Sequence, residues 1–247
     1  MMSLNNIWYV LFVVIVAGYL IMDGFDLGVG ILHMFVAKTD TERRVDLNSI
    51  GPVWDGNEVW LILAGGVLFA AFPLVYASLF SGFYGAMMLV LLVLILRTVA
   101  IEFRSKRSSS RWRTAWDLVF ALSSFGIALL LGVAFGNIMT GVPINEQGYM
   151  SPNVVALLSP YALLIGVTTV AMLSLHGAIY LSMKTDGDLL VRVKRWIPRL
   201  LIVFFVLNTL VVAASLLLHE QVSVNYLEHP WLAIFPAAAL ACVIVAW

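Results

Sequence analysis

Long apolar runs, separated by short polar connections, constrain this sequence more than any other feature. A helix needs about 20 apolar residues to cross the roughly 30 Å hydrocarbon core of a bilayer. Seven runs meet this length approximately: Ile7–Ala37, Val53–Phe72, Leu79–Ile101, Trp116–Met139, Val154–Met183, Ile197–Leu218 and Trp231–Trp247. Only 11% of the residues are charged, and seven spans account for most of the 247 residues. We therefore expect no separate soluble domain. The sequence therefore predicts an all-α, polytopic transmembrane helix bundle that forms a single integral membrane domain over residues 1–247.

The positive charges are sorted by location, although the formal net charge is zero. Apart from Arg97, every lysine and arginine falls within residues 38–44, 104–113 or 184–199, which are the first, third and fifth connections. Cytoplasmic loops carry an excess of Lys and Arg, so we expect these three connections inside the cell and the N-terminus outside. The very short connection around Pro73 predicts that the second and third spans are antiparallel neighbours. Nothing in this charge pattern indicates a nucleic-acid partner.

Two aspartates lie within the first apolar run. Asp23 and Asp26 are three residues apart and share a helix face, while Gly24 and Gly28 form a small-xxx-small pair that permits close helix approach. Ionisable groups at membrane depth are costly unless they pair or meet water, so each one suggests a functional site. The alternative is that both aspartates end the helix early and cap it at the interface. The apolar stretch Leu27–Ala37 that follows is too long for a loop.

The second and third spans add charges at the same depth. Asp55 and Glu58 lie at the cytoplasmic start of the second span, where one of them could simply complement the helix dipole. Arg97 lies at the cytoplasmic end of the third span and either snorkels to the headgroups or pairs with a carboxylate. Glu102 lies about 140° away from Arg97 around the same helix. We therefore expect Asp26 or Asp55, and not Glu102, to pair with Arg97.

These residues suit proton transfer, because carboxylates beside a cation can exchange protons. The predicted mouth of a cytoplasmic proton path comprises Asp26, Asp55, Arg97 and Glu102, none of which makes or breaks a covalent bond to substrate.

Histidines decide whether this chain is expected to hold haem, since b-type haem needs axial ligands within helices. His33 and His176 lie within spans, whereas His219 and His229 lie at the outer face, and no two form an obvious facing pair. We therefore expect no haem ligation by this chain, and interpret His33 and His176 as hydrogen-bonded bundle residues. Cys242 is the only cysteine, so no disulfide framework, thiolate cluster or other metal site is expected.

Several spaced motifs occur in one order along about the first 145 residues. They are Met22–Gly30, Gly51–Trp60, Leu68–Pro73, Phe83, Leu96–Arg97, Phe103–Arg104, Trp112–Arg113 and Gly132–Asn137. In these residues the chain resembles subunit II of the cytochrome bd quinol oxidases. The resemblance is diffuse after residue 150, and no site is transferred there.

The resemblance implies a bacterial inner-membrane complex of the respiratory electron transport chain that oxidises quinol and reduces dioxygen to water. Haem b and haem d would be carried by subunit I, which subunit II would support in assembly as a pseudo-symmetric partner. The resemblance also allows for a structurally bound quinone and small single-span accessory subunits. Asp26, Asp55, Arg97 and Glu102 match positions of a proton pathway proposed for the family, with Glu102 standing where some relatives carry Asp.

The family members usually continue well beyond this length. The resemblance therefore implies a first helix bundle at about residues 7–139 and a second, incomplete bundle at about 152–247. Two other classes compete with this interpretation. An ion-coupled secondary transporter would also show intramembrane acids beside a glycine-rich helix, and a haem-binding membrane anchor of a dehydrogenase would require the facing histidine pairs that are lacking.

Overall fold

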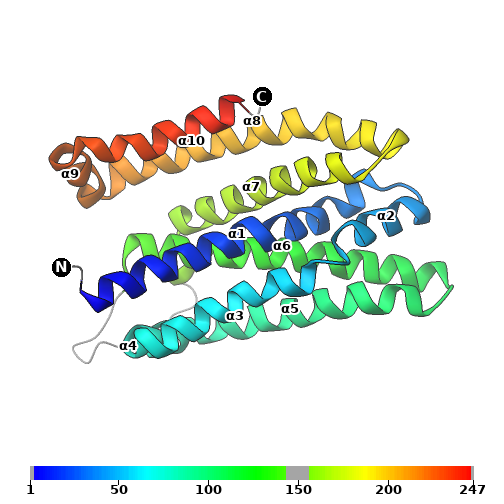
Figure 1. Cartoon of the computed structure of the whole chain (residues 1–247), viewed down its shortest axis with the longest axis horizontal. Coiled ribbons are helices and arrows are strands. Elements are labelled where there is room, and N and C mark those ends of the chain that lie inside the picture. The colour runs from blue at the N-terminus through cyan, green and yellow to red at the C-terminus, as the bar shows by residue number, and fades with distance from the viewer. Residues whose placement is uncertain (1–2, 143–155, 246–247) are drawn as a thin grey trace.

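The computed structural model describes residues 3–142 and 156–245, which are helical and contain no strand within those ranges. The elements, shown in Figure 1, are α1 (Leu4–Val36), α2 (Asp40–Ile50), α3 (Trp54–Ala71), α4 (Pro73–Gly82), α5 (Tyr84–Phe103), η1 (Arg104–Lys106), α6 (Ser110–Thr140), η2 (Ala156–Leu158), α7 (Pro160–Lys184), α8 (Gly187–Leu218), α9 (Glu220–Glu228), η3 (Pro230–Ala233) and α10 (Ile234–Val245). The long helices lie roughly parallel or antiparallel to one another.

Among the described residues, five helices are long and apolar enough to cross a membrane. They are α1, α5 with η1, α6, α7 and α8. The predicted all-α, polytopic fold is therefore confirmed, while the count of seven spans and the outward N-terminus stay predictions. The predicted first residue of the fifth span and last residue of the seventh lie outside the described residues. The proposed division into two bundles also stays a prediction.

Helix α4 corrects one sequence expectation. We expected a very short connection around Pro73, but this proline occupies the first turn of a further helix of ten residues, a position where its missing N–H costs nothing. Helices α3 and α5 run in opposite directions, as predicted (Figure 1). The prediction that they are close neighbours is wrong, because α4 separates their ends, and α3 packs mainly along α1 whereas α5 packs along α6.

Helix α1 is the centre of the arrangement and packs against α3, α6 and α7. Its contact with α7 is the closest, because a Cβ at Gly28 would lie 1.9 Å from the carbonyl oxygen of Leu173. A Cβ at Gly177 would in turn lie 2.3 Å from the carbonyl carbon of Gly28. The predicted close approach at Gly28 is confirmed, and Gly24 lies on the same face, opposite the Leu173 side chain.

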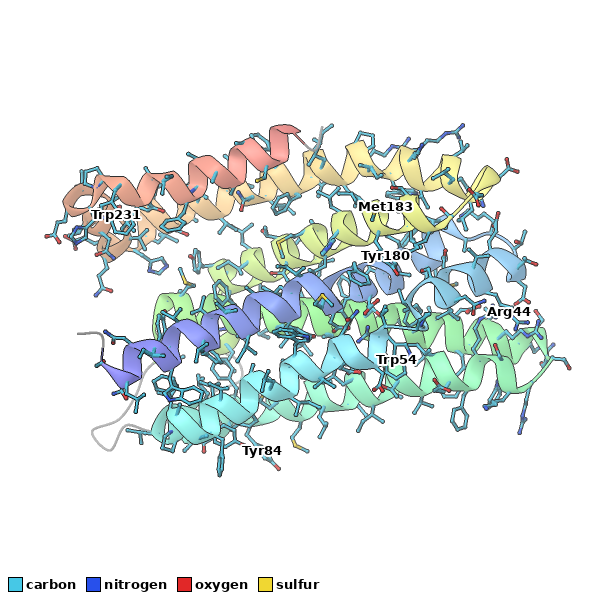
Figure 2. All side chains as sticks on the ribbon, in the orientation of Figure 1. Arg44, Trp54, Tyr84, Tyr180, Met183 and Trp231 are labelled. Atoms are coloured by element: carbon cyan, nitrogen blue, oxygen red, sulfur yellow. The ribbon has the colours of Figure 1, made fainter. Side chains whose placement is uncertain are left out.

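Helix α2 is a short polar helix between α1 and α3. Its N-terminus carries a capping box, in which the Thr39 hydroxyl accepts from the Glu42 N–H while the Glu42 carboxylate accepts from the Thr39 N–H. Its buried residues are Asp46, Leu47 and Ile50. Figure 2 shows Arg44 of α2 at one end of the bundle and Trp231 of η3 at the other.

Candidate functional site

A fully buried ion pair joins α1 to α5. The Arg97 guanidinium donates to both carboxylate oxygens of Asp23, from Nη2 at 2.8 Å and from Nη1 at 3.4 Å. Both side chains are 0% exposed. The two-pronged geometry is the one in which a guanidinium best satisfies a carboxylate, and a buried charge without such a partner would cost several kcal/mol.

The partner of Arg97 differs from our expectation. We predicted Asp26 or Asp55, but Asp23 forms the ion pair. Asp23 and Asp26 lie about 60° apart around α1, so only the placement of α5 decides which of them meets the guanidinium.

Asp26 faces α3. The Asn57 side-chain amide donates to Asp26 Oδ2 at 2.8 Å, and both residues are buried. The second carboxylate oxygen, Oδ1, is also buried and has no hydrogen-bond partner among the described residues. Buried polar atoms are normally satisfied, so this oxygen is a place where a proton or a water molecule could be accommodated.

The other two predicted site residues lie at the surface of this chain. Asp55 is exposed in the first turn of α3, and Glu102 is exposed near the end of α5. Asp55 is two residues before Asn57, so its side chain is rotated about 200° around α3 from the side chain that contacts Asp26. The structure therefore brings Asp26 and Arg97 into one buried layer and leaves Asp55 and Glu102 outside it. Glu58, which we also singled out, is partly buried.

A second buried polar cluster lies where α1, α2 and α6 meet. His33 Nδ1 is 3.2 Å from Asp46 Oδ2, and His33 Nε2 is 2.9 Å from Asp117 Oδ1. All three side chains are 0% exposed. We call this group of three residues, His33, Asp46 and Asp117, the His33 clamp.

Arginines surround the Asp117 end of the His33 clamp. Arg104 of η1 donates to Asp117 through Nε and through Nη2, the latter at 3.2 Å, and Arg43 Nη1 donates to the same carboxylate at 3.1 Å. Asp40 then bridges Arg104 and Arg113, at 2.8 Å and 2.7 Å. These ion pairs thus connect α2, η1 and the start of α6.

A separate contact ties α2 to α8. Arg192 donates to the Glu42 carboxylate and, at 2.9 Å, to the carbonyl oxygen of Val36. Partial burial alone would raise the pKa of Glu42, but the N–H groups of Lys38 and Thr39 and the Arg192 guanidinium together lower it below its usual range. Glu42 therefore keeps its charge, and its hold on Arg192, at moderately acidic pH.

Sequence reasoning missed the His33 clamp. Asp117 lies at the start of an apolar run that we read as the fourth span, and an acid in that position was the available signal. Asp46 lies in a polar connection, where nothing in the sequence distinguished it. The hydrogen-bonded role expected for His33 is confirmed. His176 instead makes an edge contact with the Phe25 ring, at 5.8 Å between centroids, and no hydrogen bond within the described part of the chain.

Among the described residues, no group of three or more His, Cys, Asp or Glu side chains is arranged so that it could hold a metal ion, the His33 clamp included. His33 could act as an axial ligand only by giving up a carboxylate, because both ring nitrogens are engaged.

The fold and these buried charges define a multi-pass α-helical membrane protein with an intramembrane ion pair and an incompletely satisfied carboxylate. Such features are typical of proteins that move ions or protons at membrane depth. Residues 4–247 match the family model described as cytochrome bd terminal oxidase subunit II. The chain belongs to that family.

Two curated relatives illustrate the similarity. The chain is 50% identical over 195 residues to cytochrome bd-I ubiquinol oxidase subunit 2 of Escherichia coli K12. The aligned region covers 77% of this chain and 52% of the relative. It is 38% identical over 206 residues to cytochrome bd ubiquinol oxidase subunit 2 of Bacillus subtilis 168, covering 83% of this chain and 61% of the relative. The aligned region thus spans about half to three fifths of the length of these relatives.

Proposed function

We propose that this chain serves as subunit II of a cytochrome bd quinol:oxygen oxidoreductase in the bacterial cytoplasmic membrane. The family match over residues 4–247 and the names of the two relatives support this assignment. In the proposed complex, quinol is oxidised, dioxygen is reduced to water, and haem b and haem d reside on subunit I. This chain would contribute no haem ligand and would support assembly of the haem-bearing subunit.

The proposed partner needs a surface to pack on. Helix α3 exposes the large apolar side chains of Ile62 and Phe69, which are 72% and 65% accessible in the isolated chain. Asp55 lies in the first turn of the same helix, which the predicted orientation makes its cytoplasmic end. A partner helix packed along Ile62 and Phe69 would leave Asn57 in place on Asp26 and the first turn of α3 open to water.

Within this complex we infer a cytoplasmic proton path through Asp26, Asp55, Arg97 and Glu102. Reduction of dioxygen to water consumes protons, so a route for them is required. The observation that carries the inference is the second oxygen of Asp26, which is buried and unpartnered among the described residues. Asp55 and Glu102 would collect protons at the surface, and Asp26 would pass them inward.

Arg97 would set the charge of this path without carrying protons itself. Its guanidinium is neutralised by Asp23, so the ion pair adds no net charge near Asp26. A proton arriving at Asp26 would then meet neither a strong repulsion nor a strong trap, which is the condition for transfer in both directions.

The test is to purify the complex from membranes through a tag on this chain, with the native residue or with Asp26→Asn. We expect b- and d-type haem on a second polypeptide in both preparations, together with quinol-driven oxygen uptake that Asp26→Asn lowers roughly tenfold or more, as loss of a proton-transferring group does. The substituted amide could still accept the hydrogen bond from Asn57, so the haem content should not change.

Asp188→Asn is the matched control, because Asp188 is an exposed carboxylate in the first turn of α8. It should leave oxygen uptake unchanged. A haem-free preparation without a partner would contradict the assignment as an oxidase subunit. Normal turnover of Asp26→Asn across pH, in a complex with full haem content, would contradict the proton path alone.

A further inference from the structure

The hydrogen bonds of the His33 clamp require one more proton than a neutral imidazole and two ionised carboxylates would carry. Ionised carboxylates only accept hydrogen bonds, and a neutral imidazole carries a single N–H. Both ring nitrogens of His33 nevertheless face a carboxylate oxygen, at 3.2 Å and 2.9 Å. Two hydrogen bonds are satisfied only if His33 is an imidazolium or one of the two aspartates is protonated.

The two ends of the clamp are held unequally. Asp117 has Arg43 and Arg104 as additional donors, so it keeps its place and its charge whatever the state of the ring. Asp46 has only His33, and its other oxygen, Oδ1, is buried without a partner among the described residues. When the extra proton leaves, the contact between His33 and Asp46 is the one that is lost.

The remaining charges around the clamp do not replace that contact. The groups that face it are Asp40, Glu42 and Arg43 of α2, Arg104 of η1, Arg113 of α6, Arg192 of α8 and the Tyr180 hydroxyl of α7. Each of them has a partner other than Asp46, and the Tyr180 hydroxyl donates to the carbonyl oxygen of Ser49 at 2.6 Å. Burial raises the pKa of Asp46, against the opposite effect of His33, so the pair favours retention of a proton.

The clamp bears on Asp26 through the chain itself. Helix α2 ends at Ile50 and α3 begins at Trp54, so only three residues separate the helix that carries Asp46 from the turn that carries Asn57. The Val53 N–H donates to the Ile50 carbonyl at 2.9 Å, which makes this connection tight. A displacement of α2 is therefore transmitted to the first turn of α3 and to the hydrogen bond between Asn57 and Asp26.

We propose that the His33 clamp is a proton-operated positioning device for the cytoplasmic mouth of this protein. With its extra proton, the clamp fixes α2 against α1 and α6 and so holds Asn57 on Asp26. When the proton passes to cytoplasmic water, His33 keeps its bond to Asp117, Asp46 is released, and α2 loosens. The effect on turnover rests on the proposed proton path, but the movement of α2 does not.

The sign of the pH dependence follows from the same proton. A group whose pKa is raised in the folded protein stabilises it while protonated, and this contribution is lost as pH rises through the raised value. The docking of α2 is accordingly tight while the clamp is protonated and weakens as pH rises through the raised pKa of the clamp. A network of permanent ion pairs would give no such dependence there, because arginine keeps its charge.

The variant Asp46→Asn distinguishes a clamp that titrates from a network of permanent ion pairs. An amide both donates and accepts, so the substituted side chain can bond to the ring whether or not Nδ1 carries a proton. His33→Gln is the second variant and removes the titrating ring altogether. In both variants the docking of α2 should no longer depend on pH, whatever its absolute strength.

The experiment is amide hydrogen exchange of residues 40–50 in the purified complex, compared between the native chain and Asp46→Asn at each pH. Comparison at equal pH cancels the intrinsic acceleration of exchange. The ratio of native to variant rates should be constant at low pH and then rise, by up to about tenfold for each pH unit above the titration of the clamp. Asp188→Asn should behave as the native chain does.

A ratio that stays constant over the whole pH range, for Asp46→Asn and for His33→Gln, would overturn the proposal. Oxygen uptake measured on the same samples keeps the two hypotheses apart. If Asp26→Asn turns over normally while α2 still loosens as pH rises, the proton path fails and the positioning device stands. If Asp26→Asn is slow but the exchange ratio is flat, the reverse holds.

Discussion

At the scale of single residues, the ion pair between Asp23 and Arg97 carries a large desolvation cost. Both side chains are fully buried, and their attraction must offset the cost of removing two charges from water. Arg97 Nε has no partner among the described residues, so the pair depends on the two Nη contacts with Asp23. Removing either partner leaves the other charge buried and uncompensated.

We therefore expect Arg97→Gln and Asp23→Asn each to destabilise the chain by about 3–5 kcal/mol, the usual cost of breaking a buried ion pair. The double variant should be less destabilised than the sum of the two, because it leaves no isolated charge. The measurement is thermal unfolding of the tagged complex for the native, single and double variants. Additive losses would show that the two side chains act independently and would contradict the pairing.

Residue-level prediction from the sequence reached the need for a carboxylate beside Arg97 but not its identity. The spacing of Asp23 and Asp26 places both near one helix face, and which of them meets α5 depends on packing that the sequence does not encode locally. Asp46 was invisible for another reason. It becomes buried only because α2 folds back on α1 and α6, whereas in the sequence it stands in a polar connection.

At the scale of elements, the contact between α1 and α7 depends on glycine. The two helix backbones touch at Gly28 and Gly177, where any side chain would collide with backbone atoms of the other helix that cannot rotate away. Small residues at such crossings are what allows membrane helices to gain dispersion and backbone contacts. Gly126 of α6 offers a contrast, because a Cβ there would lie 3.5 Å from the Val93 side chain, which is ordinary van der Waals contact.

Gly28→Ala should therefore destabilise the packing of α1 on α7 by about 1–3 kcal/mol or more, the range found for overpacked interiors. Gly126→Ala is the matched control and should be neutral or stabilising by up to about 1 kcal/mol, since alanine favours helix over glycine. Thermal unfolding and the amount of chain recovered from membranes measure both. Equal behaviour of the two variants would mean that the helices do not cross at Gly28.

The elements differ in how well the sequence predicted them. Long apolar runs located α1, α5, α6, α7 and α8, because a membrane span is defined by length and composition. Helices α2 and α4 were missed, although their signals were present. Thr39 and Glu42 have the spacing of a capping box, and Pro73 is as well suited to the first turn of a helix as to a loop.

At the scale of the whole molecule, charge is separated along the bundle. The His33 clamp and its arginines gather around α2, η1 and the start of α6, while α9 and η3 at the opposite end have no lysine or arginine (Figure 2). The positive-inside rule predicts that the first end is cytoplasmic. The proposed proton path depends on this orientation, because Asp55 and Glu102 must face the compartment that supplies the protons.

Cysteine labelling tests the orientation directly, because Cys242 is the only cysteine and can be replaced by Cys242→Ser. In that background, Gln221→Cys on α9 should react with a membrane-impermeant maleimide in intact spheroplasts, whereas Ser108→Cys, between η1 and α6, should react only after the membrane is opened. Both positions are exposed in the chain, so accessibility and not burial decides the result. The opposite pattern would invert the bundle, place Asp55 and Glu102 at the outer face, and leave Asp26 without a cytoplasmic source of protons.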